Sequence, residues 1–175
     1  MRIAIFKERR FHAYDNILYL DCDTVVNGDI SELFQKKDIP QIQMSPGSLD
    51  FGEKITKTKL KYYCNAGVFL INPSSFDSDT LVGLSEDMFQ YLHNLFESIK
   101  PDTTTCLDQD AINVVLQNYI VPLPYEYNTR YDLDKKPKTE WGVITHHINS
   151  RGLYEKEYNL TGYALDETYR KTSRI

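Results

Sequence analysis

The sequence lacks the cysteine patterns that staple small secreted domains or hold zinc. Its three cysteines, Cys22, Cys64 and Cys106, are odd in number and include no Cys-x-x-Cys pair, so neither a disulfide framework nor a zinc knuckle is indicated. A cytoplasmic location, where thiols stay reduced, fits best. No apolar run approaches the roughly 18 residues of a membrane span, and the charged N-terminus lacks the apolar segment of a signal peptide. We therefore expect no transmembrane segment, although peripheral association with a membrane stays open.

Clustered positive charge is scarce as well. The 175 residues carry 20 Lys and Arg against 25 Asp and Glu, a formal charge of −5, and the basic residues are scattered apart from short runs such as residues 7–10 and 54–61. Nucleic acids are held mainly by Lys and Arg on their phosphates. We therefore expect no nucleic-acid partner. A small anion such as a nucleoside diphosphate is compatible with this charge, above all with a cation between the two.

Short apolar runs alternate with longer helical patterns, without repeats or Gly/Ser linkers. This alternation predicts one α/β domain. The predicted strands lie at residues 17–20, 41–44, 67–71, 119–123 and 143–146, and the predicted helices at residues 29–34, 77–101 and 108–118. His93 falls outside the apolar face of the longest helix, so we expect it to be exposed. The polar stretch from Gly152 onward stays unassigned.

Two aspartates, Asp21 and Asp23, directly follow the predicted strand at residues 17–20. In an extended backbone, residues two apart point to the same side, so both carboxylates can face one point beyond the strand. Carboxylate oxygens suit Mn²⁺ or Mg²⁺. An isolated pair of this kind more often forms a turn that ends a strand, but the apolar run directly before it favours a metal site. The same pattern occurs in haloacid-dehalogenase-like phosphatases, where Asp21 would be the nucleophile and Asp23 the acid/base. The other residues that such phosphatases need are not evident.

Three further segments accompany the aspartate pair. The four together are residues 14–34 with Asp-Cys-Asp, 63–72 with Asn-Ala-Gly, 107–113 with Asp-Gln-Asp, and 143–147 with His-His. In order and approximate spacing they resemble the family 8 glycosyltransferases, the group that contains glycogenin and the bacterial lipopolysaccharide glucosyl- and galactosyltransferases. The resemblance covers most of the chain. It implies a GT-A-type, Rossmann-like mixed sheet flanked by helices.

The resemblance implies a metal site formed by Asp21, Asp23 and His146, which would bind Mn²⁺ or Mg²⁺. A neutral imidazole can complete a site with two carboxylates and two diphosphate oxygens. His147 stands where the family usually has an aromatic residue. The cation would offset the charge that develops on the departing nucleoside diphosphate.

The resemblance also implies a donor-sugar site. Asn65 and the backbone at Ala66 would lie near the sugar, and Arg2 would approach the nucleotide. Asp108 would contact sugar hydroxyl groups, with Gln109 beneath the anomeric carbon. In isolation, Asp108 would be interpreted as a helix N-cap, a role that is compatible with the first.

The implied reaction is the transfer of a hexose from UDP-glucose or UDP-galactose to a glycan or lipid-linked saccharide, in lipopolysaccharide or polysaccharide biosynthesis. Family members retain the anomeric configuration. The amide oxygen of Gln109 is barely basic, which makes it a poor nucleophile for a double displacement. We therefore favour a same-face substitution in which the leaving phosphate helps to deprotonate the acceptor.

The sequence departs from the family at two places. Family domains usually begin with a strand-helix-strand-helix portion that holds uridine, and this portion would precede the segment around Arg2. We therefore interpret residues 1–175 as a single partial GT-A domain, truncated at its N-terminus, that contains the metal-binding and acceptor side. After His146 the family has a Lys-Pro-Trp that grips the diphosphate, and here Arg151 is the expected phosphate contact. An inactive remnant, or half of a split enzyme, is the alternative to an active transferase.

Overall fold

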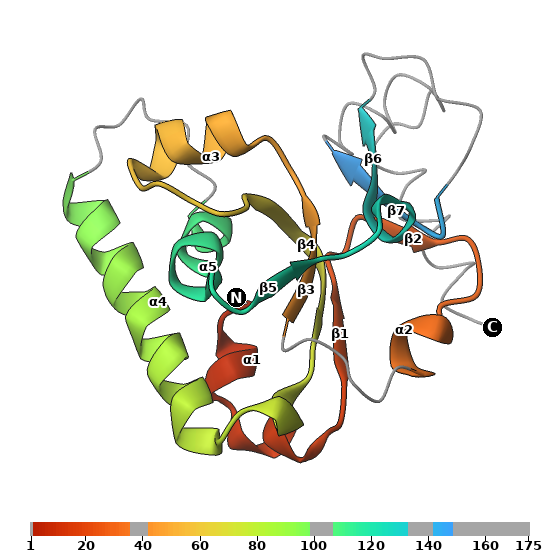
Figure 1. Cartoon of the computed structure of the whole chain (residues 1–175), viewed down its shortest axis with the longest axis horizontal. Coiled ribbons are helices and arrows are strands. Elements are labelled where there is room, and N and C mark those ends of the chain that lie inside the picture. Colours follow the sequence, from red (N-terminus) through yellow and green to blue (C-terminus); the bar gives the residue numbers. More distant parts are fainter. Residues whose placement is uncertain (1, 36–41, 99–106, 133–141, 149–175) are drawn as a thin grey trace, which may run out of the picture.

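The computed structural model describes residues 2–35, 42–98, 107–132 and 142–148, with only the main chain described for residues 130–132 and 145–148. These residues form two sheets with helices around them (Figure 1). No helix among the described residues is long and apolar enough to cross a membrane.

The larger sheet is mixed and has four strands. Their order is β1 (Ile17–Leu20), β4 (Cys64–Ile71), β3 (Ile42–Pro46) and β5 (Ile120–Pro122). Strand β4 runs antiparallel to both β1 and β3, whereas β3 and β5 are parallel. The predicted mixed sheet is therefore confirmed.

The smaller sheet has three strands, in the order β2 (Thr24–Val26), β7 (Ile144–Ile148) and β6 (Thr129–Asp132). Strand β7 is antiparallel to β2 and parallel to β6. Because β1 ends at Leu20 and β2 begins at Thr24, residues 21–23 connect the two sheets. The aspartate pair thus lies at the junction between them.

The helices divide between the two faces of the larger sheet. One face carries α1 (Ala4–Lys7), the long α4 (Ser78–Ser98) and α5 (Asp108–Leu116), with α3 (Leu49–Thr56) above α5 in Figure 1. The other face carries α2 (Glu32–Gln35) near the smaller sheet. The described residues also include three 3₁₀ segments, η1 (Arg9–Ala13), η2 (Pro73–Ser75) and η3 (Tyr125–Asn128).

Strand β4 is buried on both faces, which explains its nearly continuous apolar sequence. Phe69 and Ile71 belong to a core between the larger sheet and helices α1, α4 and α5. Val68 and Leu70 belong to a second core with residues of α2, η3 and β7. Alternate residues of β4 therefore contribute to the two cores, one on each face of the sheet.

Helix α3 packs closely against the start of β4. Ser48 caps the helix, because its hydroxyl oxygen accepts from the Phe51 N–H at 3.4 Å. A Cβ atom at Gly52 would overlap the ring of Tyr63, so this position requires glycine. Lys57 ends the helix in the left-handed region, with φ of 56°.

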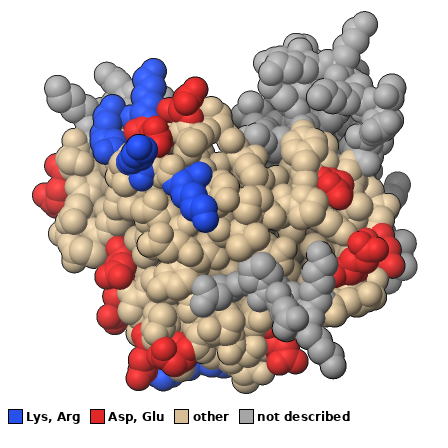
Figure 2. Space-filling model, in the orientation of Figure 1, with Lys and Arg blue, Asp and Glu red and all other residues tan. Residues whose placement is uncertain are grey.

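The lysines of residues 54–61 lie in the last turn of α3 and in the segment that follows it. Lys54, Lys57, Lys59 and Lys61 are all exposed, and Figure 2 shows blue side chains gathered over the α3 end of the molecule with acidic groups beside them. Elsewhere on this view acidic side chains are the more frequent charged groups, in keeping with the net negative charge.

Most of the elements predicted from sequence are confirmed. The strand predicted at residues 17–20 is β1 with the same bounds, and the other predicted strands correspond to β3, β4, β5 and β7 with shifted bounds. The two longer predicted helices correspond to α4 and α5, and the short one predicted at residues 29–34 corresponds to α2, which begins later, at Glu32. His93 is exposed, as expected. Phe96 follows the apolar spacing of α4 but is 60% exposed, because the buried face of this helix ends at Leu92. The short elements α3, β2 and β6 were not predicted.

The first core gives a stability prediction. Leu81 is 1% exposed in α4, whereas Leu49 is 39% exposed at the start of α3. We expect Leu81→Ala to lower the free energy of unfolding by about 2–5 kcal/mol, because it removes buried methyl groups and leaves a cavity. Leu49→Ala, the matched control, should cost less than about 1 kcal/mol. Urea unfolding followed by circular dichroism measures both, and equal losses would contradict this packing.

Candidate active site

Asp21 and Asp23 occupy the segment that leads from the larger sheet to the smaller one. The Asp21 N–H donates to the Gly67 carbonyl at 2.7 Å, and the Asp21 carbonyl accepts from the N–H and the hydroxyl group of Thr24 at 3.1 and 2.8 Å. These bonds turn the chain at the carboxyl end of β1. Asp21 and Asp23 are partly buried, whereas Cys22 between them is exposed. This burial pattern agrees with two carboxylates on the same side of the chain.

Arg2 joins the aspartate pair to the start of α5. Its Nη2 atom lies 3.2 Å from a carboxylate oxygen of Asp21, and its Nε atom lies 3.1 Å from Oδ2 of Asp108. All three side chains are largely buried, so these ion pairs are less screened than pairs on an open surface. The structure thus brings together Arg2, Asp21 and Asp108, three residues predicted from sequence to act in one site.

Tyr19 supports Asp21 from within β1. Its ring stacks on Phe69 with centroids 4.8 Å apart, and its hydroxyl group donates to Oδ1 of Asp21 at 2.7 Å. Burial raises the pKa of Tyr19 to about 12, and the hydrogen bond to Asp21 contributes to the rise. Tyr19 therefore keeps its proton at neutral pH and remains a donor to this carboxylate.

Gln109 and Asn65 form the second part of the site. The Gln109 Oε1 atom accepts from the Ala66 N–H at 3.1 Å and from Asn65 Nδ2 at 3.2 Å. Asn65 Oδ1 in turn accepts from the Gly67 N–H and from Asn128 Nδ2, both at 3.0 Å. The Asn-Ala-Gly and Asp-Gln-Asp segments, both expected near the donor sugar, are thus joined by direct hydrogen bonds.

Sequence reasoning missed several polar residues beneath these groups. Asn113 accepts from the Cys64 N–H at 2.6 Å and donates to the Cys64 carbonyl at 2.8 Å. The Tyr63 hydroxyl group donates to Oδ1 of Asp110 at 2.6 Å. Asp110, Asn113 and Asn128 are fully buried. For Asp110 and Asn113 the sequence signal is a polar residue among the apolar positions of a helix, since buried polar groups normally have hydrogen-bond partners. Asn128, in η3, has no such signal.

The predicted metal ligands are described in part. Strand pairing places the main chain of His146 opposite Thr24, the residue after Asp23. The side chain of His146, and all of Arg151, lie outside the described residues. Among the described side chains, no group of three or more His, Cys, Asp and Glu residues is arranged to hold a metal ion. The two carboxylates are the kind of oxygen ligand that Mn²⁺ or Mg²⁺ prefers.

Comparison with known proteins connects this arrangement to sugar transfer. The model of Glycosyl transferase family 8 matches residues 1–149. The chain is 29% identical over 158 residues to the probable glycosyl transferase Gly of Streptococcus gordonii, which covers 85% of this chain and 21% of that protein. It is 28% identical over 134 residues to the lipopolysaccharide 1,2-glucosyltransferase of Escherichia coli (strain K12), which covers 71% of this chain and 36% of that protein. The matched region thus spans about a fifth to a third of these curated relatives.

Two solved structures have the same fold. The galactosyltransferase LgtC, solved in complex with donor and acceptor sugar analogs, superimposes with a TM-score of 0.63 at 17% identity, covering 98% of this chain and 65% of that one. The glycosyltransferase GlyE of Streptococcus pneumoniae TIGR4 gives a TM-score of 0.59 at 20% identity, covering 98% and 46%. The predicted GT-A-type fold is therefore confirmed.

The family match also decides whether the strand followed by Asp-x-Asp belongs to a glycosyltransferase or to a haloacid-dehalogenase-like phosphatase. The matched region contains both aspartates and the Asp-Gln-Asp segment, and the family is one of glycosyltransferases. The match extends over residues 1–149 of 175, which is most of the chain. The chain belongs to glycosyl transferase family 8.

Proposed function

We propose that this chain transfers a hexose from a UDP-sugar to a saccharide acceptor, with retention of the anomeric configuration. The observation that carries the proposal is the pairing of Arg2 with both Asp21 and Asp108. This pairing places the aspartate pair, which offers oxygen ligands for a cation, next to the start of α5 and to Gln109. A cation site beside hydrogen-bonding groups for a sugar is what a nucleotide-sugar donor requires.

We infer that Asp21, Asp23 and His146 hold Mn²⁺ or Mg²⁺ together with diphosphate oxygens. The bound cation would offset the charge that develops on the departing nucleoside diphosphate. The proximity of the His146 main chain to Asp23 through the β2–β7 pairing supports this assignment. Arg151 is the proposed further phosphate contact, because a guanidinium group pairs well with phosphate oxygens.

The donor sugar would lie against Asn65, Ala66, Asp108 and Gln109. A carboxylate has about four acceptor positions, and Arg2 takes one position on Asp108. Asp108 therefore keeps acceptor capacity for sugar hydroxyl groups. Arg2 holds this carboxylate in place and also reduces the repulsion between it and Asp21.

The surroundings of Gln109 favour a same-face substitution. Its Oε1 atom already accepts two N–H groups, which further weakens an amide oxygen that is barely basic. In the proposed reaction the acceptor oxygen forms a bond to the anomeric carbon as the bond from that carbon to the phosphate oxygen breaks. The acceptor proton passes to the leaving phosphate, so no strong protein base is needed.

The relatives support a hexose donor and a glycan or lipid-linked acceptor. Two of them are named as a lipopolysaccharide 1,2-glucosyltransferase and a lipopolysaccharide 1,3-galactosyltransferase. We therefore propose UDP-glucose or UDP-galactose as the donor, and action on the cytoplasmic side in polysaccharide biosynthesis. We propose further that residues 1–175 contain the metal-binding and acceptor side of a GT-A domain.

Removing one metal ligand tests the cation site. We expect Asp23→Ala to weaken UDP binding in the presence of Mn²⁺ by at least about a hundredfold, because the diphosphate is held through the cation. Isothermal titration calorimetry on the 175-residue chain measures this loss. Asp87→Ala, an exposed acidic residue on α4, is the matched control and should bind as wild type. If the wild-type chain fails to bind UDP with Mn²⁺, the remnant or split-enzyme interpretation replaces this one.

Neutralising Asp108 separates sugar recognition from diphosphate binding. We expect Asp108→Asn to lower kcat/KM for donor hydrolysis or transfer by about tenfold to a hundredfold, since a charge-assisted hydrogen bond contributes about 1.5–3 kcal/mol. Binding of UDP with Mn²⁺, measured by the same calorimetry, should stay within about threefold of wild type, because UDP lacks the sugar. An equal loss in both measurements would place Asp108 at the diphosphate instead.

A further inference from the structure

We propose that Tyr63 and Asp110 are positioning residues that fix the side-chain amide of Gln109 in a single orientation, with its oxygen toward β4 and its NH₂ group toward Tyr63. The inference rests on the proposed function, in which Gln109 lies beneath the donor sugar. It assigns roles to two residues that do not themselves contact the sugar in this scheme. Both roles depend on which atoms of the network can only donate hydrogen bonds and which can only accept them.

Asp110 is fully buried in the first turn of α5. The Tyr63 hydroxyl group donates to Oδ1 of Asp110 at 2.6 Å. A phenol has a single proton, so this hydrogen bond fixes the direction in which Tyr63 donates.

The same phenol oxygen contacts Gln109. Once the Tyr63 proton points to Asp110, this oxygen can only accept along its other directions. The Gln109 atom 2.9 Å away must then be Nε2, which donates to it. Asp110 thus determines, through Tyr63, which end of the Gln109 amide faces Tyr63.

The backbone of β4 leads to the same orientation independently. A main-chain N–H can only donate, so the Gln109 atom that faces the Ala66 N–H must be Oε1. The Gly67 N–H likewise requires Oδ1 of Asn65 to face it, which leaves Asn65 Nδ2 to donate to Gln109 Oε1. Both ends of the network therefore require the same orientation of the Gln109 amide. In a flipped amide, Nε2 would face the Ala66 N–H and Oε1 would face the phenol oxygen of Tyr63, so two donors would meet at one end and two acceptors at the other.

Close packing holds Tyr63 in this place. Tyr63 is 3% exposed, and its ring lies against the Gly52 backbone on one side and edge-on to Phe51, with centroids 5.9 Å apart. Asn113 also binds both backbone groups of the next residue, Cys64. The phenol oxygen thus has little freedom to leave the space between Asp110 and Gln109.

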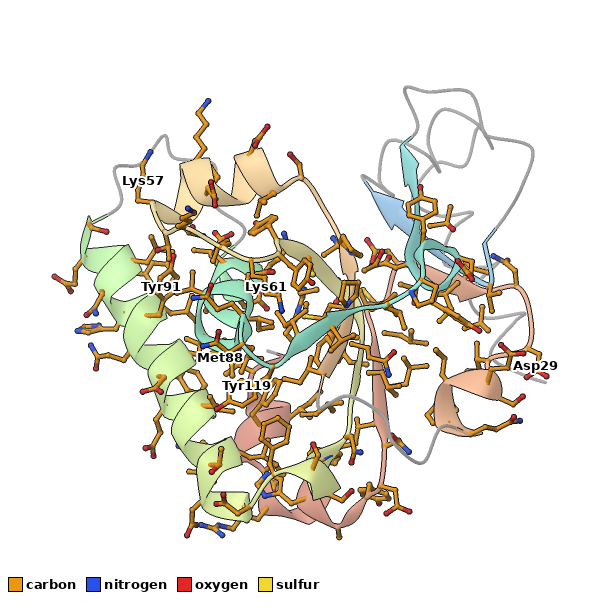
Figure 3. All side chains as sticks on the ribbon, viewed as in Figure 1. Asp29, Lys57, Lys61, Met88, Tyr91 and Tyr119 are labelled. Atoms are coloured by element: carbon orange, nitrogen blue, oxygen red, sulfur yellow. The ribbon has the colours of Figure 1, made fainter. Side chains whose placement is uncertain are left out.

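A direct test observes the amide itself. In nitrogen-15 NMR spectra of the whole chain, the Gln109 side-chain signal is identified by its disappearance in Gln109→Ala. We expect Tyr63→Phe, which keeps the ring but removes the acceptor, to shift this signal and to accelerate its exchange with solvent. Tyr119→Phe is the matched control, because Tyr119 packs on Phe76 at the far end of α5 (Figure 3). An unmoved Gln109 signal in a folded Tyr63→Phe variant would overturn the proposal.

Kinetics supply the second test. We expect Tyr63→Phe to lower kcat by about tenfold to a hundredfold with little change in KM for the donor, because a displaced positioning group weakens the reacting geometry. In the Gln109→Ala background the same change should cost nothing more, since Tyr63 acts through Gln109. An equal loss in both backgrounds would make Tyr63 merely structural and would overturn the proposal.

The two tests separate this inference from the proposed function. A wild-type chain that turns over no UDP-sugar would contradict the proposed function, and the NMR comparison would still decide whether Tyr63 orients Gln109. Conversely, an active wild type with an unmoved Gln109 signal would leave the transferase assignment in place and remove this inference alone.

Discussion

The pairing of Asn113 with the backbone of Cys64 fixes α5 against the first residue of β4, and the site depends on this attachment. One amide both accepts from the Cys64 N–H and donates to its carbonyl, so the helix cannot slide along the strand without losing both bonds. Asp108, Gln109 and Asp110 lie in the first turn of the same helix. Their places relative to the Asn-Ala-Gly segment are therefore set from within the protein core.

A second constraint is electrostatic. Asp21, Asp23 and Asp108 place three carboxylates at one end of the larger sheet, and close like charges destabilise a fold. Arg2 lies within 3.2 Å of two of them and offsets part of this repulsion. The cation proposed at this site would offset the repulsion further. The same feature that costs stability thus serves the proposed binding of a metal diphosphate.

The parts of the site that could be predicted from sequence are those that a pattern of neighbouring residues identifies. Asp21 and Asp23 follow a short apolar strand, and the apolar period of α4 is long enough to identify the helix. The motif resemblance added Asn65 and Gln109, whose direct contact the structure then provided. The short strands β2 and β6 were missed because each depends on neighbours elsewhere in the fold rather than on its own pattern. Helix α3 does have a local signal, the cap at Ser48, which was overlooked.

The buried polar network between the start of β4 and α5 could not be predicted from sequence either, for a related reason. Tyr63 and Asp110 are 47 positions apart, and Cys64 and Asn113 are 49 apart. Their roles appear only when α5 is docked on β4, since one sequence carries no sign of which distant groups meet. Predictions for His146 and Arg151 stay predictions, because their side chains lie outside the described residues.

The most direct test of the central claim is to follow UDP-glucose and UDP-galactose hydrolysis by proton NMR, with and without Mn²⁺, and to identify the anomer released first. We predict that the 175-residue chain releases the hexose only with the metal ion, and that the first product keeps the α configuration of the donor. Release of the β anomer, or turnover that is equally fast without a divalent cation, would contradict a retaining, metal-dependent transferase.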